Sequence, residues 1–211
     1  MYPILYSFRR CPYAMRARLS LAYSGISYIH REILLKKRPD ELYMISPKGT
    51  VPVMELSDKT VIDESLDIMK WALSHNDPEK IYKENIKEQN DMIVANDGEF
   101  KKQLDQYKYH IRFPDDSYQS YQDKVALTLS YYNRMLSSSR YLVGQRMSLA
   151  DMALFPFVRQ CAHVDFEWFN NQFLHLSLWL EEFKTSEIFT SIMKKYDVWE
   201  SGTDGVVVEW S

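Results

Sequence analysis

The chain has 211 residues, of which 45% are hydrophobic and 26% are charged, a composition typical of a globular protein with a packed core. The formal net charge is -3, and Lys and Arg form no long run, so nucleic acid is not an expected partner. Only two cysteines occur, which is too few for a disulfide framework or a cysteine-based metal site. No apolar run approaches the roughly 20 residues that span a bilayer. We therefore expect a cytoplasmic protein that acts without a metal and without a membrane.

Strand and helix signals alternate over the first part of the chain. Short apolar runs are typical of buried strands, and a proline suits the first turn of a helix because its missing N–H is not needed there. The predicted elements are a strand over 4–8, a helix over 12–24, a strand over 27–33, a helix over 39–45, strands over 51–56 and 60–62, and a helix capped by Ser65 that runs towards Leu73. This order, βαβαββα, predicts a first domain over residues 1–76.

After Pro78 the strand signals stop, and helical spacing continues to about residue 196. We therefore expect an all-helical second domain over residues 81–211. Ser148 and Asp151 have the spacing of a capping box, and Pro156 inside the following helix predicts a kink or an early break. The valine-rich tail matches neither pattern and is assigned to no element.

Cys11 directly follows the first predicted strand and stands at the start of a helix that has Pro12 in its first turn. The free N–H groups and the dipole of a helix N-terminus stabilise an anion, and thiol pKa values at such sites fall from about 8.5 into a range of roughly 3.5–7.5. Arg9 and Arg10 add positive charge nearby. Cys11 is therefore the candidate nucleophile, and the alternative interpretation is a buried structural cysteine.

The segment Phe8-Arg9-Arg10-Cys11-Pro12-Tyr13-Ala14 resembles the active-site loop of glutaredoxins and of cysteine-type glutathione transferases, the omega class and its bacterial relatives. Ala14 stands where dithiol members have a second cysteine, so no internal disulfide can resolve the site. The resemblance covers almost the whole chain and fades after about residue 196. It implies the glutathione transferase fold, in which a thioredoxin-like α/β N-terminal domain precedes an all-α C-terminal domain.

Two further segments resemble the family's glutathione site. Residues 46–52 resemble the loop that ends in a cis-proline, in which the residue before Pro52, Val51, offers its backbone to the cysteinyl part of glutathione. Glu64 and Ser65 resemble the acidic-Ser turn that receives the γ-glutamyl group, and Lys48 could reach the glycyl carboxylate. The alternatives are that Pro52 only shapes a turn, that Glu64 and Ser65 only cap a helix, and that Lys48 is solvated.

The resemblance implies an enzyme that uses glutathione as cosubstrate. Cys11 would attack a mixed disulfide with glutathione on a small-molecule or protein partner, and a second glutathione would regenerate the thiol. The alternatives are conjugation of glutathione to electrophiles and a non-catalytic binding or regulatory role. The resemblance also implies a homodimer, for which the mixed polar and apolar helix over residues 92–100 is a candidate surface.

The remaining candidates have weaker signals. Cys161 is expected to be an inert core residue. The five histidines show no metal-ligand spacing, so no metal site is predicted. Four aromatic residues of the helical half would either line an acceptor pocket or belong to the core. These four are Tyr107, Tyr109, His110 and Trp168.

Overall fold

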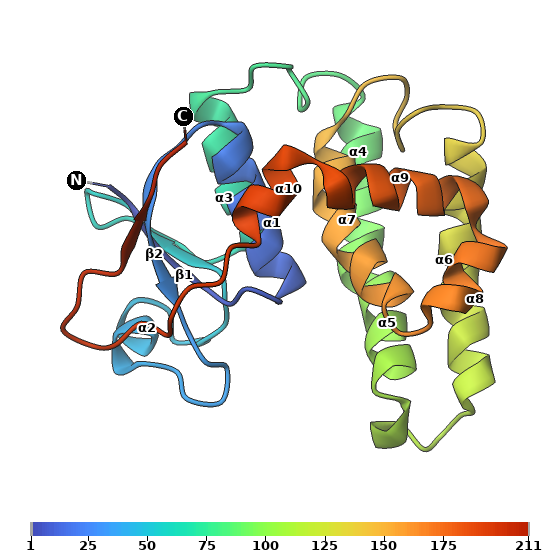
Figure 1. Cartoon of the computed structure of the whole chain (residues 1–211), viewed down its shortest axis with the longest axis horizontal. Helices are drawn as coiled ribbons and strands as arrows, with labels where there is room; N and C mark the ends of the chain where they lie inside the picture. The colour runs from blue at the N-terminus through green and yellow to red at the C-terminus, as the bar shows by residue number, and fades with distance from the viewer. Residues whose placement is uncertain (1, 211) are drawn as a thin grey trace. The chain divides into compact units, whose positions relative to one another are not determined.

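The structure, a computed structural model, describes residues 2–210 and divides into two compact units (Figure 1). The first unit combines the chain up to Glu79 with the chain from Glu187 onward, and the second unit comprises Lys80–Ser186. The helical domain predicted over residues 81–211 thus extends further than the second unit, which ends at Ser186. The reason is that the last residues of the chain return to the sheet of the first unit.

The first unit is built on a five-stranded mixed sheet with the strand order β4-β3-β1-β2-β5. The parallel pair β1 and β2 lies in its middle, and the three other pairings are antiparallel. The predicted order βαβαββα is observed, with strands shorter than expected by one to three residues at their ends. The elements are β1 (Ile4–Ser7), α1 (Pro12–Tyr23), β2 (Tyr28–Glu32), α2 (Asp40–Ile45), β3 (Val53–Glu55), β4 (Val61–Ile62), α3 (Ser65–His75), α10 (Glu187–Ile192) and β5 (Val206–Val208).

Successive residues of β1 serve opposite faces of the sheet, because side chains alternate along a strand. Leu5 packs with residues of α1 and α3 on one face, whereas Tyr6 packs with Leu42 of α2 on the other. Figure 1 shows α1 and α3 side by side and α2 apart from them. The two apolar clusters thus pack on both faces of β1, and the loop that leaves β1 is the one that carries Cys11.

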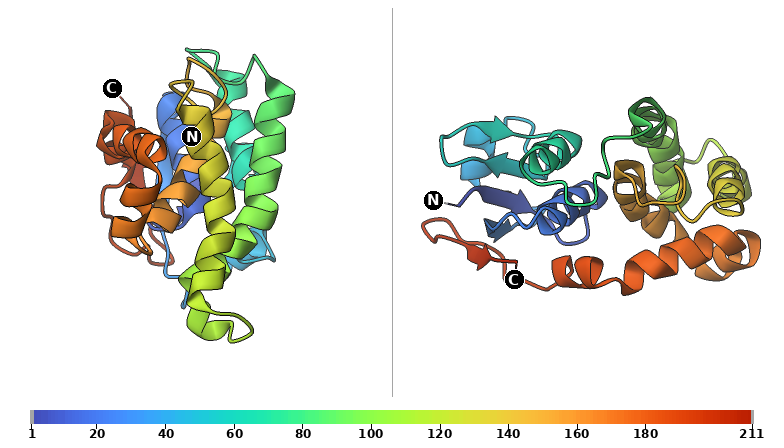
Figure 2. Two further views of the ribbon diagram at one scale, coloured as in Figure 1. Left: turned by 90° about the vertical axis from the view of Figure 1, so that its right-hand side faces the viewer. Right: turned by 90° about the horizontal axis from the view of Figure 1, so that it is seen from above.

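The C-terminal segment, defined here as residues 193–210, lies along the sheet edge formed by β2. Its strand β5 pairs with β2 in the register Tyr28↔Val208 and His30↔Val206 (Figure 2). Val208 is buried in the cluster formed by β1, α1 and α3. The valine-rich tail is therefore an edge strand, which its β-branched residues favour.

The regular elements described in the second unit are all helical, and an isolated β-bridge joins Tyr141 to Gly144. Its longest helix, α6, packs against α5 and α9, and α7 packs against α4 and α9. The elements are α4 (Ile86–Ala95), a π-helical turn η1 (Asn96–Phe100), α5 (Lys101–Lys108), a 3₁₀ turn η2 (His110–Arg112), α6 (Tyr118–Leu136), α7 (Leu149–Ala162), α8 (Phe166–Gln172) and α9 (Leu174–Thr185).

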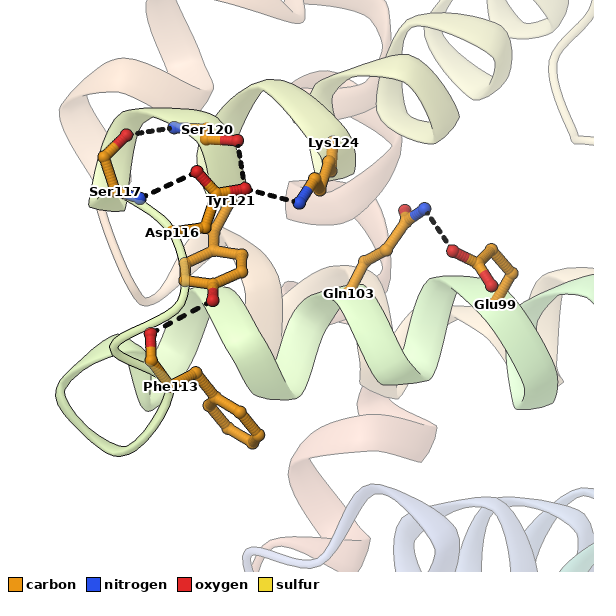
Figure 3. Close-up of polar contacts among 8 residues, drawn as sticks. All are labelled: Glu99, Gln103, Phe113, Asp116, Ser117, Ser120, Tyr121 and Lys124. Carbon is orange, nitrogen blue, oxygen red and sulfur yellow. Dashed lines mark hydrogen bonds and ion pairs between the residues drawn. The ribbon is translucent and has the colours of Figure 1, made fainter.

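Side-chain caps define where the longer helices of this unit begin. The predicted capping box of α7 is present: the Ser148 hydroxyl accepts from the Asp151 backbone N–H, and Asp151 accepts from the Ser148 backbone N–H. The helix continues through Pro156, so of the two predicted alternatives, a kink or an early break, the early break does not occur. At α6, the Ser120 N–H donates to the Ser117 hydroxyl, while Asp116 accepts from Lys124 (Figure 3).

Candidate active site

Cys11 occupies the N-cap position of α1, with Pro12 as the first helical residue, as the sequence predicts. Its N–H donates to the Phe8 carbonyl at 3.0 Å, which closes the tight turn between β1 and the helix. Cys11 is half-buried and packs against the apolar cluster that contains Tyr6 and Val51. The positive end of the α1 dipole thus points towards the region where the thiol stands.

The turn before β3 brings a second backbone segment to Cys11. The Val51–Pro52 peptide bond is cis, as the resemblance implies, and the Cys11 thiol donates to the Val51 carbonyl at an Sγ–O distance of 3.6 Å. Gly49 stands in this loop with a φ of +60°, and a Cβ there would overlap the Tyr43 ring. A larger residue at position 49 would therefore be strained by the positive φ and would require the exposed Tyr43 ring to move.

A polar group lines the start of α3. Lys48 forms ion pairs with Glu64 at 2.6 Å and with Asp63 at 3.3 Å, and Ser46 donates to Asp63 at 3.0 Å. The hydrogen bond to Glu64 is the main reason why the pKa of Lys48 is raised. Lys48 is therefore engaged by two carboxylates, rather than merely solvated.

The N-terminus of α3 differs in detail from the prediction. Ser65 was expected to cap the helix, but Glu64 holds the N-cap position and Ser65 is the first helical residue, 5% exposed. The Glu64 side chain makes no capping hydrogen bond. The first-turn N–H groups of α3 are thus not satisfied by the cap side chain, and a ligand carboxylate is one group that could bind there.

Arg18 is the site residue that sequence reasoning missed. It follows Cys11 by seven residues, two helical turns, so it lies on the same face of α1 and its side chain leans towards the helix N-terminus. It is fully buried and donates to the carbonyls of Phe8 and Arg9 and to the Ser7 hydroxyl. Burial lowers the pKa of Arg18, while the nearby phenol of Tyr28, carboxylate of Glu32 and thiol of Cys11 oppose that effect.

The remaining candidates are Cys161 and the aromatic residues of the second unit. Cys161 is fully buried in α7, and burial strongly raises the pKa of its thiol, as expected of an inert core cysteine. Tyr107 is also buried, and its hydroxyl lies 3.0 Å from that of Tyr118. The His110 ring lies 5.0 Å from the Tyr118 ring, and the Trp168 ring lies 5.9 Å from the Tyr107 ring. Three of the four aromatic candidates, Tyr107, His110 and Trp168, therefore form one cluster with Tyr118.

Within residues 2–210, no three His, Cys, Asp or Glu side chains come together in a group that could hold a metal ion. Over the same residues, no helix combines the length and the apolar character that crossing a bilayer requires.

Two family models match this chain. Residues 5–80 match the one described as glutathione S-transferase, N-terminal domain, and residues 104–187 match glutathione S-transferase, C-terminal domain. A protein named "Probable glutathione transferase" from Aplysia californica is 34% identical over 88 residues, which are 42% of this chain and 96% of that protein. The chain belongs to the glutathione S-transferase superfamily.

Within this superfamily, the chain has relatives in the omega class. Glutathione S-transferase omega-2 of Mus musculus is 44% identical over 62 residues, which cover 29% of this chain but only 25% of that protein. The solved glutathione transferase Omega 3C from Trametes versicolor superposes with a TM-score of 0.74 at 19% identity, covering 94% of this chain and 91% of that one. Poplar glutathione transferase F1 superposes with a TM-score of 0.77 at 18% identity, covering 92% and 97%. These superpositions show the common fold.

Proposed function

We propose that the protein is a glutathione-dependent thiol transferase in which Cys11 is the only nucleophile. The observation that carries this proposal is the position of the Cys11 thiol, at the N-terminus of α1 and 3.6 Å from the carbonyl of Val51. A helix N-terminus favours the thiolate, and the thiolate is the form that attacks disulfides.

The proposed reaction has two exchange steps. The Cys11 thiolate attacks the glutathionyl sulfur of a mixed disulfide, so that a Cys11–glutathione disulfide forms and the acceptor leaves as a thiolate, which takes a proton from water. A second glutathione, as its thiolate, then attacks the glutathionyl sulfur bound to Cys11, which releases glutathione disulfide and restores the Cys11 thiolate. Ala14 provides no second thiol, so the second glutathione is the reductant.

We further propose that glutathione lies along the Val51–Pro52 turn. In this mode the Val51 backbone pairs with the cysteinyl residue as an added strand would, and Ser65 and the first turn of α3 bind the γ-glutamyl carboxylate. Glu64 pairs with the free amine, and Lys48 pairs with the glycyl carboxylate. In this structure Lys48 and Glu64 pair with each other at 2.6 Å, so this ion pair has to open for the two side chains to reach the opposite ends of an extended glutathione.

A parallel assay of three reactions tests the proposal. Purified protein is supplied with glutathione and with hydroxyethyl disulfide, dehydroascorbate or an aryl halide. The proposal predicts activity with the disulfide that Cys11→Ser abolishes. Activity only with the aryl halide would instead establish conjugation, and activity with none of the three would favour a binding role.

We also propose that the protein works in the cytoplasm as a homodimer. The helix over residues 92–100 does not itself offer an apolar surface, because Met92, Ile93 and Phe100 are buried in the helical unit. The most exposed large apolar residues of α4 and α6 are instead Val94, at 70%, and Leu127, at 74%. A groove of about 730 Å³ lies between these two helices. Sedimentation equilibrium tests the dimer: a mass near the 25.1 kDa of one chain would reject it.

A further inference from the structure

Two buried side chains hold the backbone of the Cys11 loop, defined here as residues 8–11. Arg18 donates to the Arg9 carbonyl at 2.7 Å, and it donates to the Phe8 carbonyl at 3.3 Å. Glu32, at the end of β2, accepts from the Arg9 N–H at 2.7 Å. The Cys11 N–H donates to the same Phe8 carbonyl. The position of Cys11 therefore depends on how firmly Arg18 and Glu32 are held.

Glu32 is held in turn by His30. The His30 Nε2 atom lies 2.9 Å from the carboxylate oxygen of Glu32 that does not bind Arg9, and both side chains are buried. Because the Glu32 carboxylate can only accept, Nε2 of the neutral imidazole is the donor of this hydrogen bond, and among the described residues Nδ1 has no partner. Polar contact with Glu32 alone does not fix the plane of the imidazole ring.

The C-terminal segment supplies that missing restraint. The ring of Tyr196 covers the His30 ring at a centroid distance of 4.3 Å and an interplanar angle of 31°. The backbone N–H of Trp199 donates to the backbone carbonyl of Glu32 at 2.7 Å. Gly205 approaches the same strand so closely that a Cβ on it would lie 2.7 Å from the His30 carbonyl. The segment thus contacts both His30 and Glu32, through backbone and side chain.

We infer that the C-terminal segment positions the nucleophile: Tyr196 orients His30, His30 orients Glu32, and Glu32 holds the Arg9 N–H and with it the Cys11 loop. This inference rests on the proposed role of Cys11 as the nucleophile. It makes Tyr196 and His30 positioning residues, since neither contacts the substrate in this arrangement.

The experiment measures the reactivity of Cys11 directly, without glutathione. The rate of carboxamidomethylation by iodoacetamide is followed against pH, and the modified residue is located by peptide mass spectrometry, which separates Cys11 from the buried Cys161. Tyr196→Leu removes the ring over His30 and keeps an apolar side chain, whereas Tyr196→Phe keeps the ring. Trp210→Leu is the matched control, because Trp210 belongs to the same segment but donates to the Ile26 carbonyl at the opposite end of β2.

Tyr196→Leu is expected to slow alkylation at neutral pH by roughly tenfold and to move the midpoint of the pH–rate profile, because small displacements of a reacting group have large effects on rate. Tyr196→Phe is expected to react like the wild type, and so is Trp210→Leu. Amide hydrogen exchange of Arg9 is a second measurement, which remains informative if a variant is only partly stable. Its protection should fall in Tyr196→Leu alone.

Two results would overturn the inference: a wild-type pH–rate profile in Tyr196→Leu, or an equal change in Trp210→Leu. The second would mean that the segment acts only through overall stability. Absence of disulfide exchange with glutathione would overturn the proposed function, but it would leave this test of the Cys11 loop intact, because alkylation requires no glutathione.

Discussion

The Cys11 sulfur and the Val51 carbonyl oxygen, 3.6 Å apart, belong to residues that are separated by 40 positions in the chain. They meet because β1 and β3 are adjacent antiparallel strands, with Tyr6 paired to Val53. Cys11 follows the end of β1, and Val51 precedes the start of β3. A tripeptide that pairs with the Val51 backbone would therefore present its central residue to the Cys11 thiol.

Cys11→Ser should abolish thiol exchange, because the serine hydroxyl is not ionised at neutral pH and cannot form the mixed disulfide. Cys161→Ser is the matched control, and it should leave the activity nearly intact because Cys161 is buried in α7. Steady-state rates with hydroxyethyl disulfide measure both. Loss of activity in a folded Cys161→Ser protein would mean that the nucleophile has been misassigned.

Ser65→Ala should weaken glutathione binding by about 0.5–1.5 kcal/mol if a single hydroxyl hydrogen bond is lost. Isothermal titration calorimetry with Cys11→Ser protein measures the affinity without turnover. Ser74→Ala provides the control, since the Ser74 hydroxyl lies at the other end of α3 and donates to the Trp71 carbonyl. Equal affinities of the Ser65→Ala and wild-type sites would place the γ-glutamyl group elsewhere.

Lys48→Met should lower the affinity for glutathione and should also reduce its dependence on salt. The Lys48 side chain is 52% exposed, so its attraction for the glycyl carboxylate is screened by ions in solution. Titrations at low and high ionic strength measure both effects. If the affinity of Lys48→Met for glutathione depended on salt as steeply as that of the wild type, the glycyl carboxylate would bind another cationic side chain.

The stability of the first unit should decrease as the pH falls below the ordinary histidine pKa of 6.5. Burial, more than any other factor, lowers the pKa of His30, with Arg18 adding to the effect and the hydrogen bond to Glu32 opposing it. The unfolded chain therefore takes up a proton at pH values where the folded protein does not. This contribution to stability is present above pH 6.5 and is lost as the pH falls from 6.5 towards the lowered folded-state value.

Urea unfolding at pH 7.5 and at pH 5.5 measures this effect. His30→Gln, which has no titrating group, should lose less stability over that interval than the wild type. Tyr28, Tyr196, Arg18 and Glu32 face His30 and remain in both proteins, so the difference reports His30 itself. Equal losses in the two proteins would contradict the assignment.

Ser148→Ala should cost about 1 kcal/mol of stability, because it removes one half of the capping box of α7. Asp151→Ala should cost more, about 3 kcal/mol or above, since the Asp151 carboxylate also accepts from the Leu142 N–H and from the Trp179 indole N–H. Denaturant unfolding followed by tryptophan fluorescence and by circular dichroism compares the two. The reverse order of the losses would show that the carboxylate is not the centre of this network.

Local patterns predicted the elements on which the site stands. The strand–Cys–Pro–helix sequence predicted that Cys11 begins α1, and the turn residues before Pro52 predicted the loop that meets it. Errors arose at ends of elements. The cap of α3 moved from Ser65 to Glu64, because the boundary depends on which residue first adopts helical dihedral angles and not on the best capping side chain.

What the sequence by itself determined is a candidate nucleophile, the Cys11 thiol, and its place at a helix N-terminus, because both depend on neighbouring residues. What only the tertiary structure decided is how that nucleophile is supported. Arg18 resembles an ordinary charged residue of a surface helix, yet it is buried beneath the Cys11 loop. Tyr196 meets His30 only because the tail returns to the edge of β2. The periodicity of apolar residues indicates which face of an element is buried. It does not indicate which distant segment covers that face, because this depends on the packing of the whole unit.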